Sequence, residues 1–227
     1  MMTEKTQPKT LCPFILINLF LFISTIIVTY FTLNFGTVAG QVDTGTTDGG
    51  FYIATFTVES NLFLGLVALI SLIFALKSLK TKTALPRPLL TLYLMAATST
   101  MLTFLTVLLF LAPVRALNGR NYFDMFLGPM FFFHFFNPLL AALNLIFFPT
   151  NKKLNLKSRL LSILPFALYC IPYLLNVVIL KTWPDFYGLT FGGNYALLPL
   201  VFLVFSLVIF SISSLLSYCH NHKIALK

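Results

Sequence analysis

Two short segments of this chain combine side chains that donate, accept or transfer protons with long apolar surroundings. FTVESNL, residues 56–62, carries Thr57, Glu59 and Asn61, and HFFNPLL, residues 134–140, carries His134 and Asn137. On a helix Thr57 and Asn61 share one face because they are four residues apart, whereas Glu59 points about 200° away. An ionisable side chain inside a membrane span is by default a hypothesis for a functional site, since a charge there costs ~2.5–3.5 kcal/mol or more. The residues alone predict a buried polar site of undetermined use.

Composition places these segments in a membrane. Of the 227 residues, 58% are hydrophobic and 9% are charged, and the mean hydropathy is +0.92. A soluble domain carries roughly 25% charged residues, so this chain has too few to cover a surface that faces water. The sequence therefore predicts an all-α, polytopic membrane protein.

Six apolar runs are long enough for a spanning helix, which needs ~20 residues. The expected spans cover about 11–35, 51–76, 88–112, 124–148, 160–181 and 196–219. The connections are short, so we expect one six-helix transmembrane domain over residues 1–227 and no separate soluble domain. The first run has no small-residue cleavage site behind it, and we interpret it as a retained span rather than a signal peptide.

The positions of the basic residues predict an orientation. Segments 77–87 and 149–159 carry four Lys or Arg each, and the N-terminal segment and the C-terminal tail carry two each. Only three of the 15 lie in the other connections, and residues 36–50 contain none. Because Lys and Arg concentrate in cytoplasmic loops, we expect a multi-pass protein of the cell membrane with both termini in the cytoplasm. The net charge of +9 is then a topology signal and not a sign of nucleic-acid binding.

Both polar segments enter the bilayer from the outer side in this orientation. At 1.5 Å per residue, we expect Thr57 roughly 9 Å and His134 roughly 15 Å below the outer ends of their spans. Pro138 has no N–H for the His134 carbonyl, so the helix should bend beside the histidine. A purely structural interpretation remains open, because Thr and Ser side chains often join membrane helices by hydrogen bonds.

Three segments together resemble the androgen-induced and androgen-dependent TFPI-regulating protein family of intramembrane hydrolases, including its small bacterial six-span relatives. They are FTVESNL (56–62), HFFNPLLAALNLIFF (134–148) and TWPDFYGLTFGGNY (182–195). The bacterial relatives show an aromatic–Thr–x–x–Ser–Asn–Leu signature, a His followed by Pro and aliphatic residues, and a last loop with an aromatic residue, Pro and Tyr before a turn. The likeness covers the whole chain in topology and these three stretches in residues. It departs from the animal members at Asn61, near which those members carry an acidic residue.

The resemblance implies a six-helix bundle that hydrolyses fatty acid esters of hydroxy fatty acids and needs no cofactor or metal ion. On this pattern Thr57 is the nucleophile, and His134 is the base that activates it and later protonates the leaving group. Asn61 and Asn137 are the nearest amides by helical spacing and are the expected oxyanion donors. Thr55 is the alternative nucleophile. The implied substrate is a membrane lipid or fatty-acyl ester that arrives from the outer leaflet.

Two other classes of function remain open. A transporter or small-molecule-binding bundle would line a pathway with Glu59, His134, Asn144 and Asn176, and proline-broken helices suit such a protein. A structural membrane protein would use the same groups only to join its helices.

Two further features of the sequence are interpreted without a functional role. The sequence CHNH, residues 219–222, places possible ligands too close together for a structural zinc site, and we interpret it as a solvated tail beside the membrane. Glu59 has no assigned role, and we expect it to be neutral in lipid or paired with Arg115 or Arg120 near the outer lip.

Overall fold

The chain folds into helices joined by turns, as seen in a computed structural model that describes residues 8–35 and 54–226. Six segments of the described residues are long and apolar enough to cross a membrane. They are Leu11–Asn34, Phe56–Thr81, Arg87–Leu117, Pro129–Ile146, Leu156–Ile179 and Tyr195–Ala225. The predicted all-α bundle of six spans is confirmed, and the chain is a polytopic membrane protein.

Several spans contain more than one helical element. The α-helices are α1 (Pro8–Phe35), α3 (Phe56–Thr81), α4 (Arg87–Thr106), α5 (Ala112–Leu117), α6 (Pro129–Phe131), α7 (Asn137–Ile146), α8 (Leu156–Leu161), α9 (Leu164–Leu174) and α10 (Leu198–Ala225). Three π-helical turns, Val107–Leu111, Phe132–Phe136 and Leu175–Ile179, continue α4, α6 and α9. Short 3₁₀ turns, Tyr122–Phe126 and Tyr195–Leu197, precede α6 and α10.

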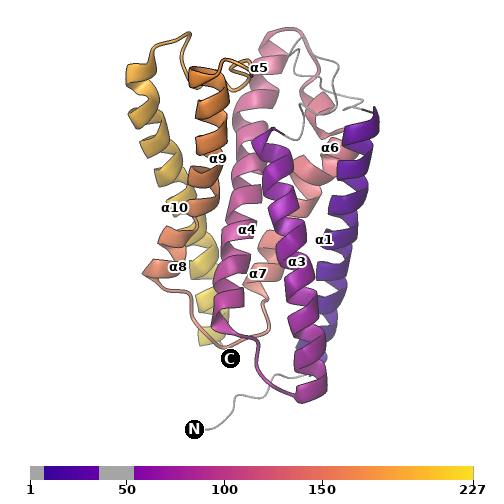
Figure 1. Cartoon of the computed structure of the whole chain (residues 1–227). Helices are drawn as coiled ribbons and strands as arrows, with labels where there is room; N and C mark the ends of the chain where they lie inside the picture. Colours follow the sequence, from indigo (N-terminus) through magenta and orange to yellow (C-terminus); the bar gives the residue numbers. More distant parts are fainter. Residues whose placement is uncertain (1–7, 36–53, 227) are drawn as a thin grey trace.

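The spans run side by side around α4, which packs against α3, α7 and α10. Figure 1 shows α1 and α3 on one side of the bundle and the α9–α10 pair on the other. We call the end where α1 begins and α10 ends the basal end, and the opposite end, where α3 begins, the apical end (Figure 1). Both polar segments identified in the sequence lie toward the apical end.

Two of the π-helical turns follow from proline. Val107–Leu111 and Phe132–Phe136 each end two residues before a proline. Proline donates no backbone hydrogen bond, and its ring crowds the carbonyl four residues back; a wider turn relieves this crowding. In the second turn the Asn137 N–H donates to the carbonyl five residues back. The bend expected beside His134 because of Pro138 therefore takes the form of a π-helical turn.

The second span is shorter at its apical end than the sequence predicted. The helix begins at Phe56 and not at residue 51, because Thr55 is extended with φ −82° and ψ 142°. Thr57 therefore lies in the first turn of α3, and the predicted depth of roughly 9 Å is wrong.

The fourth span is also shorter at this end. It begins at Pro129 and not at residue 124, because Tyr122–Phe126 forms a separate 3₁₀ turn and Gly128 has a φ of +57°. His134 lies five residues into the helical segment, or about 7.5 Å at 1.5 Å per residue, which is half the predicted depth.

An aromatic core holds the basal half together. The rings of Phe14 and Phe148 have centroids 4.8 Å apart, and Tyr93 lies 5.7 Å from Phe148. The buried Asn144 amide donates a 2.7 Å hydrogen bond to the Tyr93 hydroxyl. This pairing satisfies the amide inside the core and gives Asn144 a structural role.

The C-terminal helix extends past the expected span end, as far as Ala225. His220 is fully buried, with Nδ1 3.1 Å from the Leu145 carbonyl oxygen and Nε2 3.1 Å from that of Lys152. The prediction of a solvated tail is therefore wrong for His220, because the continuing helix carries it against the end of α7.

Helices α1 and α3 approach closely at Gly65. A Cβ atom at this position would lie 2.8 Å from Thr25 Cγ2. Small residues let membrane helices pack at short distance, and here the absent side chain leaves room for the Thr25 methyl group.

We expect Gly65→Ala to lower the free energy of unfolding by about 1–3 kcal/mol, because the added methyl group overpacks this contact. Thermal unfolding of the purified protein in detergent measures the change as a lower Tm. Adding Thr25→Ala should recover part of the loss, and Leu66→Ala, at a side chain that is 55% exposed, serves as a control. An unchanged Tm for Gly65→Ala would contradict the close packing of α1 on α3.

Candidate functional site

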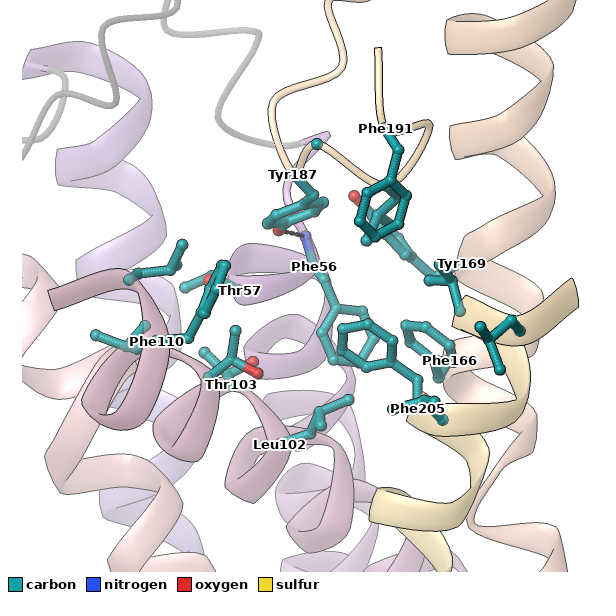
Figure 2. A pocket seen from close by; sticks show the side chains of 18 of the residues that line it. Phe56, Thr57, Leu102, Thr103, Phe110, Phe166, Tyr169, Tyr187, Phe191 and Phe205 are labelled. Carbon is teal, nitrogen blue, oxygen red and sulfur yellow. Dashed lines mark hydrogen bonds between the residues drawn. The ribbon is translucent and has the colours of Figure 1, made fainter. Parts of the chain in front are cut away.

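An apolar cavity of about 460 Å³ lies toward the apical end between α3, α4, α9 and α10, and we call it the Thr57 cavity. Its polar groups are few, and they are Thr57, Thr103, Thr106, Tyr169 and Tyr187. Figure 2 shows Thr57, Thr103 and Phe110 on one side of the cavity and the Phe56, Phe166 and Phe205 rings on the other. A volume of this size with an apolar wall and a few polar groups is typical of small-molecule sites.

The connection between α9 and α10 covers the cavity and brings Tyr187 to the start of α3 (Figure 2). The Tyr187 hydroxyl accepts a 2.8 Å hydrogen bond from the Phe56 N–H, and Tyr187 lines the cavity together with Thr57. Burial raises the pKa of Tyr187 to about 12, so the phenol keeps its proton at neutral pH. The Tyr169 hydroxyl donates to the Ala54 carbonyl at 2.8 Å. Two tyrosines thus fix where α3 begins.

Asp185 organises the same connection. Its carboxylate accepts hydrogen bonds from the Tyr173 hydroxyl, from the Leu189 N–H at 3.0 Å and from the Thr190 N–H at 2.8 Å. The Thr190 hydroxyl donates a further bond of 2.5 Å. Partial burial opposes ionisation, but these donors outweigh it and hold the pKa of Asp185 below its usual range. The ionised carboxylate therefore shapes the segment that positions Tyr187.

His134 is 5% exposed and is held by the 3₁₀ turn that precedes its helix. Its Nδ1 lies 2.6 Å from the Met125 carbonyl oxygen. A carbonyl oxygen only accepts hydrogen bonds, so Nδ1 carries the proton, and in the neutral ring Nε2 is the basic nitrogen. A ring oriented in this way is ready to accept a proton at Nε2.

Asn61 ties the first turn of α3 to the histidine segment. Its Nδ2 donates to the Thr57 carbonyl at 2.9 Å and to the Phe133 carbonyl at 3.3 Å. Asn61 therefore joins the backbone at Thr57 to the residue before His134. Both amide hydrogens are used in these bonds, so this geometry does not offer the oxyanion donor expected at Asn61. Its buried Oδ1 has no partner among the described residues.

Asn137 has the complementary arrangement. Its Oδ1 accepts a 3.0 Å hydrogen bond from the Ser24 hydroxyl, and its buried Nδ2 has no partner within residues 8–35 and 54–226. A buried amide donor without a partner costs about 1–3 kcal/mol, and such groups often mark functional sites. Asn137 thus retains a free N–H, as an oxyanion donor requires.

The predicted site residues are only partly gathered in one place. Among the described residues, Thr57 lines the cavity, whereas His134, Asn61 and Asn137 do not. Asn61 connects the two groups through backbone carbonyls. Thr55 caps α3 and is also absent from the cavity lining.

The groups expected along a transport pathway are dispersed. Asn144 lies in the basal core, and Asn176 donates to the Pro172 carbonyl on partly exposed helix surface. Glu59 is exposed and lines a different cavity from Thr57. The described residues do not bring these groups together along one route.

Sequence reasoning missed Tyr187 and Asp185 as site residues. They occur in the quoted segment TWPDFYGLTFGGNY, but their partners at Phe56 and Tyr173 are distant in sequence or in another element. The one available signal was a carboxylate and a tyrosine in a connection otherwise poor in charge.

The fold and the cavity define a six-helix membrane protein with an apolar site beneath a structured connection. Comparisons with protein-family models, with curated proteins and with solved structures find no match to this chain. A more specific assignment therefore depends on the geometry of the site and on the resemblance of its short segments.

Acidification is expected to loosen the connection that carries Asp185. The folded pKa lies below the ordinary value of 3.8, so the stabilisation is fully present above that value and is lost as the pH falls through the lower folded pKa. Fluorescence of Trp183, the one tryptophan of the chain, measures this as an acid transition. The transition should disappear in Asp185→Asn and persist in Asp124→Asn. A transition of equal size in Asp185→Asn would assign it to another group.

Proposed function

We propose that this protein is an intramembrane hydrolase of fatty-acyl esters, with Thr57 as nucleophile and His134 as general base. The observation that carries the proposal is Thr57 in the wall of an apolar cavity, directly after Phe56, whose N–H donates to the Tyr187 hydroxyl. An acyl chain suits the apolar lining, and an ester carbonyl would then lie against the hydroxyl. The likeness of three segments to the intramembrane hydrolase family gives independent support.

The reaction begins at the Thr57 hydroxyl. Thr57 Oγ1 attacks the ester carbonyl carbon while its proton passes to His134 Nε2, directly or through one water molecule. The tetrahedral intermediate collapses, the C–O bond to the alcohol breaks, and His134 returns the proton to the departing alkoxide. Water then attacks the acyl-Thr57 carbonyl with His134 again taking a proton. Fatty acid is released, and the Thr57 hydroxyl is restored.

The fixed tautomer of His134 supports its role as base. The Met125 carbonyl holds the Nδ1 proton, so the free electron pair is on Nε2. This is the role that an orienting partner has in other nucleophile–base pairs. The Asn61 bridge between the Thr57 and Phe133 carbonyls keeps the two helix segments in register.

An oxyanion donor must lie within hydrogen-bond reach of the substrate carbonyl. Asn137 Nδ2 has no partner among the described residues, but Asn137 does not line the Thr57 cavity, so the oxyanion role expected of it is not part of this proposal. Tyr187 holds the start of α3, which carries Thr57, because its hydroxyl accepts from the Phe56 N–H. Asn61 acts as a positioning residue, because its amide hydrogens are already used.

Substrate reaches the cavity from the bilayer. Three residues that line the cavity also face outward, with Phe110, Leu200 and Val204 58%, 56% and 49% exposed. A lipid could therefore insert its acyl chain between α4 and α10 without crossing water. The charge distribution supports a cell-membrane protein with the basal end and both termini in the cytoplasm, so the substrate is a membrane lipid or fatty-acyl ester of the outer leaflet.

Thr57→Ala is expected to reduce hydrolysis of a panel of fluorogenic acyl esters to background, and His134→Ala to reduce kcat by about 10²–10⁴-fold. The purified variants are assayed in detergent, with thermal unfolding as the test of folding. Thr106→Ala is the matched control, since it removes a hydroxyl from the same cavity, and Thr55→Ala tests the alternative nucleophile. Full activity of Thr57→Ala against every ester would rule out this proposal.

Tyr187→Phe is expected to lower kcat by about 10²-fold with little change in KM, because the ring still lines the cavity while the Phe56 N–H loses its acceptor and the start of α3, which carries Thr57, is no longer held. Tyr122→Phe is the matched control, since its hydroxyl donates to the Leu108 carbonyl and its side chain does not line the cavity. A rise in KM without a fall in kcat would assign Tyr187 to substrate binding and not to the alignment of Thr57.

A further inference from the structure

A second cavity of about 460 Å³ lies on the other face of the α3 start, between α3, α4 and α9. We call it the Glu59 groove, and the lining residues used below are Glu59, Phe63, Met95, Leu164, Leu168 and Trp183. Phe56 and Tyr169 line both this groove and the Thr57 cavity. These two rings therefore stand between two separate spaces.

The groove follows the helix axes. Its lining residues on α3 lie at positions 56, 59, 60 and 63, and those on α9 lie at 164, 165, 168, 169 and 172. Both sets have helical spacing, and the seven steps from Phe56 to Phe63 on α3 extend about 10 Å at 1.5 Å per residue. Leu164 and Leu168 are 44% and 55% exposed, so the groove is open toward lipid. Its direction and its apolar wall fit one alkyl chain lying parallel to the lipid chains.

The apical end of the groove has a different chemistry. Glu59 is the one charged residue among the described residues that line it. Its exposed carboxylate forms no ion pair with the part of the chain that the structure describes. A carboxylate only accepts hydrogen bonds when ionised, so it pairs with a group that donates and carries positive charge. The groove thus offers an acceptor that a cation would satisfy.

Aromatic residues line the same groove as this acceptor. Trp183 and Tyr169 line the groove with Glu59, and Phe56 and Phe63 lie on the same helix. The face of an aromatic ring, and of Trp above all, attracts ammonium groups within about 6 Å. A carboxylate combined with aromatic rings selects an ammonium headgroup over a hydroxyl or a second carboxylate, because only the ammonium gains from both.

We propose that the Glu59 groove binds a single-chain amphiphile with an ammonium headgroup, which pairs with Glu59 beside Trp183 while the alkyl chain lies along Phe63, Met95 and Leu168. A single chain is expected because the lining residues on α3 and on α9 each form one run along the helix axis, with Leu92 and Met95 added from α4. This site does not rest on the hydrolase proposal, because it uses a separate cavity and none of the proposed catalytic residues.

Trp183 provides the measurement, since it is the chain's one tryptophan and lies in the groove. The purified protein in micelles of a non-ionic maltoside detergent, which carries no ammonium group, is titrated with a nitroxide-labelled long-chain alkylamine and with the matching alkyl alcohol. We expect the amine to quench Trp183 at a concentration about tenfold lower than the alcohol. In Glu59→Gln this preference should disappear, while a chain-dependent quench common to both ligands remains.

Asp124→Asn is the matched control, because it removes a carboxylate from an apical turn outside the groove. It should keep the preference of the wild-type protein for the amine. Equal quenching by amine and alcohol in the wild-type protein, or an unchanged preference in Glu59→Gln, would overturn the proposal. Hydrolysis assayed on the same Glu59→Gln sample separates this outcome from the hydrolase proposal, because a failure of either leaves the other standing.

Discussion

The start of α3 is the constraint on which the apical half of the molecule depends. The first N–H groups of a helix have no partner within the helix, and at membrane depth there is little water to satisfy them. Here the Tyr187 hydroxyl accepts from the Phe56 N–H, and the Tyr169 hydroxyl donates to the Ala54 carbonyl. The connection after α9 must therefore fold back over α3, and the space enclosed beneath it becomes the Thr57 cavity. The need to give hydrogen-bond partners to the start of α3 thus places the connection after α9, the cavity and the Thr57 hydroxyl together.

Hydropathy was sufficient to predict the six spans, because the cost of exposing apolar side chains to water is a local property of each run. It was not sufficient to place the apical ends. The sequence of residues 51–55 is apolar enough to belong to the span that follows it. Thr55 is nevertheless extended, because its neighbours Ala54 and Phe56 are hydrogen-bonded to Tyr169 and Tyr187 from a distant part of the chain. The start of the fourth span carried a usable signal, since Gly128 followed by Pro129 is a common start for a helix. The burial of His220 could not be predicted, because it depends on carbonyl groups of α7 and of the segment after it.

Helical spacing grouped the candidate site residues by face but gave no information about their partners. It correctly gave Thr57 and Asn61 neighbouring positions on α3, yet the amide of Asn61 is used by two backbone carbonyls. At Asn137 the amide oxygen is used and the nitrogen is not. Its Oδ1 accepts from the Ser24 hydroxyl, and its Nδ2 has no partner among the described residues. The same side-chain type therefore has a positioning role at one place and an available donor at the other. Burial and hydrogen-bond geometry decide between these roles, and neither is encoded in the spacing.

The π-helical turn at Phe132–Phe136 lets this span hold one extra residue without turning the rest of the helix. A turn of this kind closes its hydrogen bond over five residues in place of four, so the added residue widens one turn and does not advance the helix by a further ~100°. Asn137 and Asn144 on α7 therefore keep the directions in which they meet Ser24 and Tyr93. The same residue inserted into α7 itself, where the turns are α-helical, would rotate everything after it. Along this span, FFHFF is the place where a change in chain length can be absorbed locally.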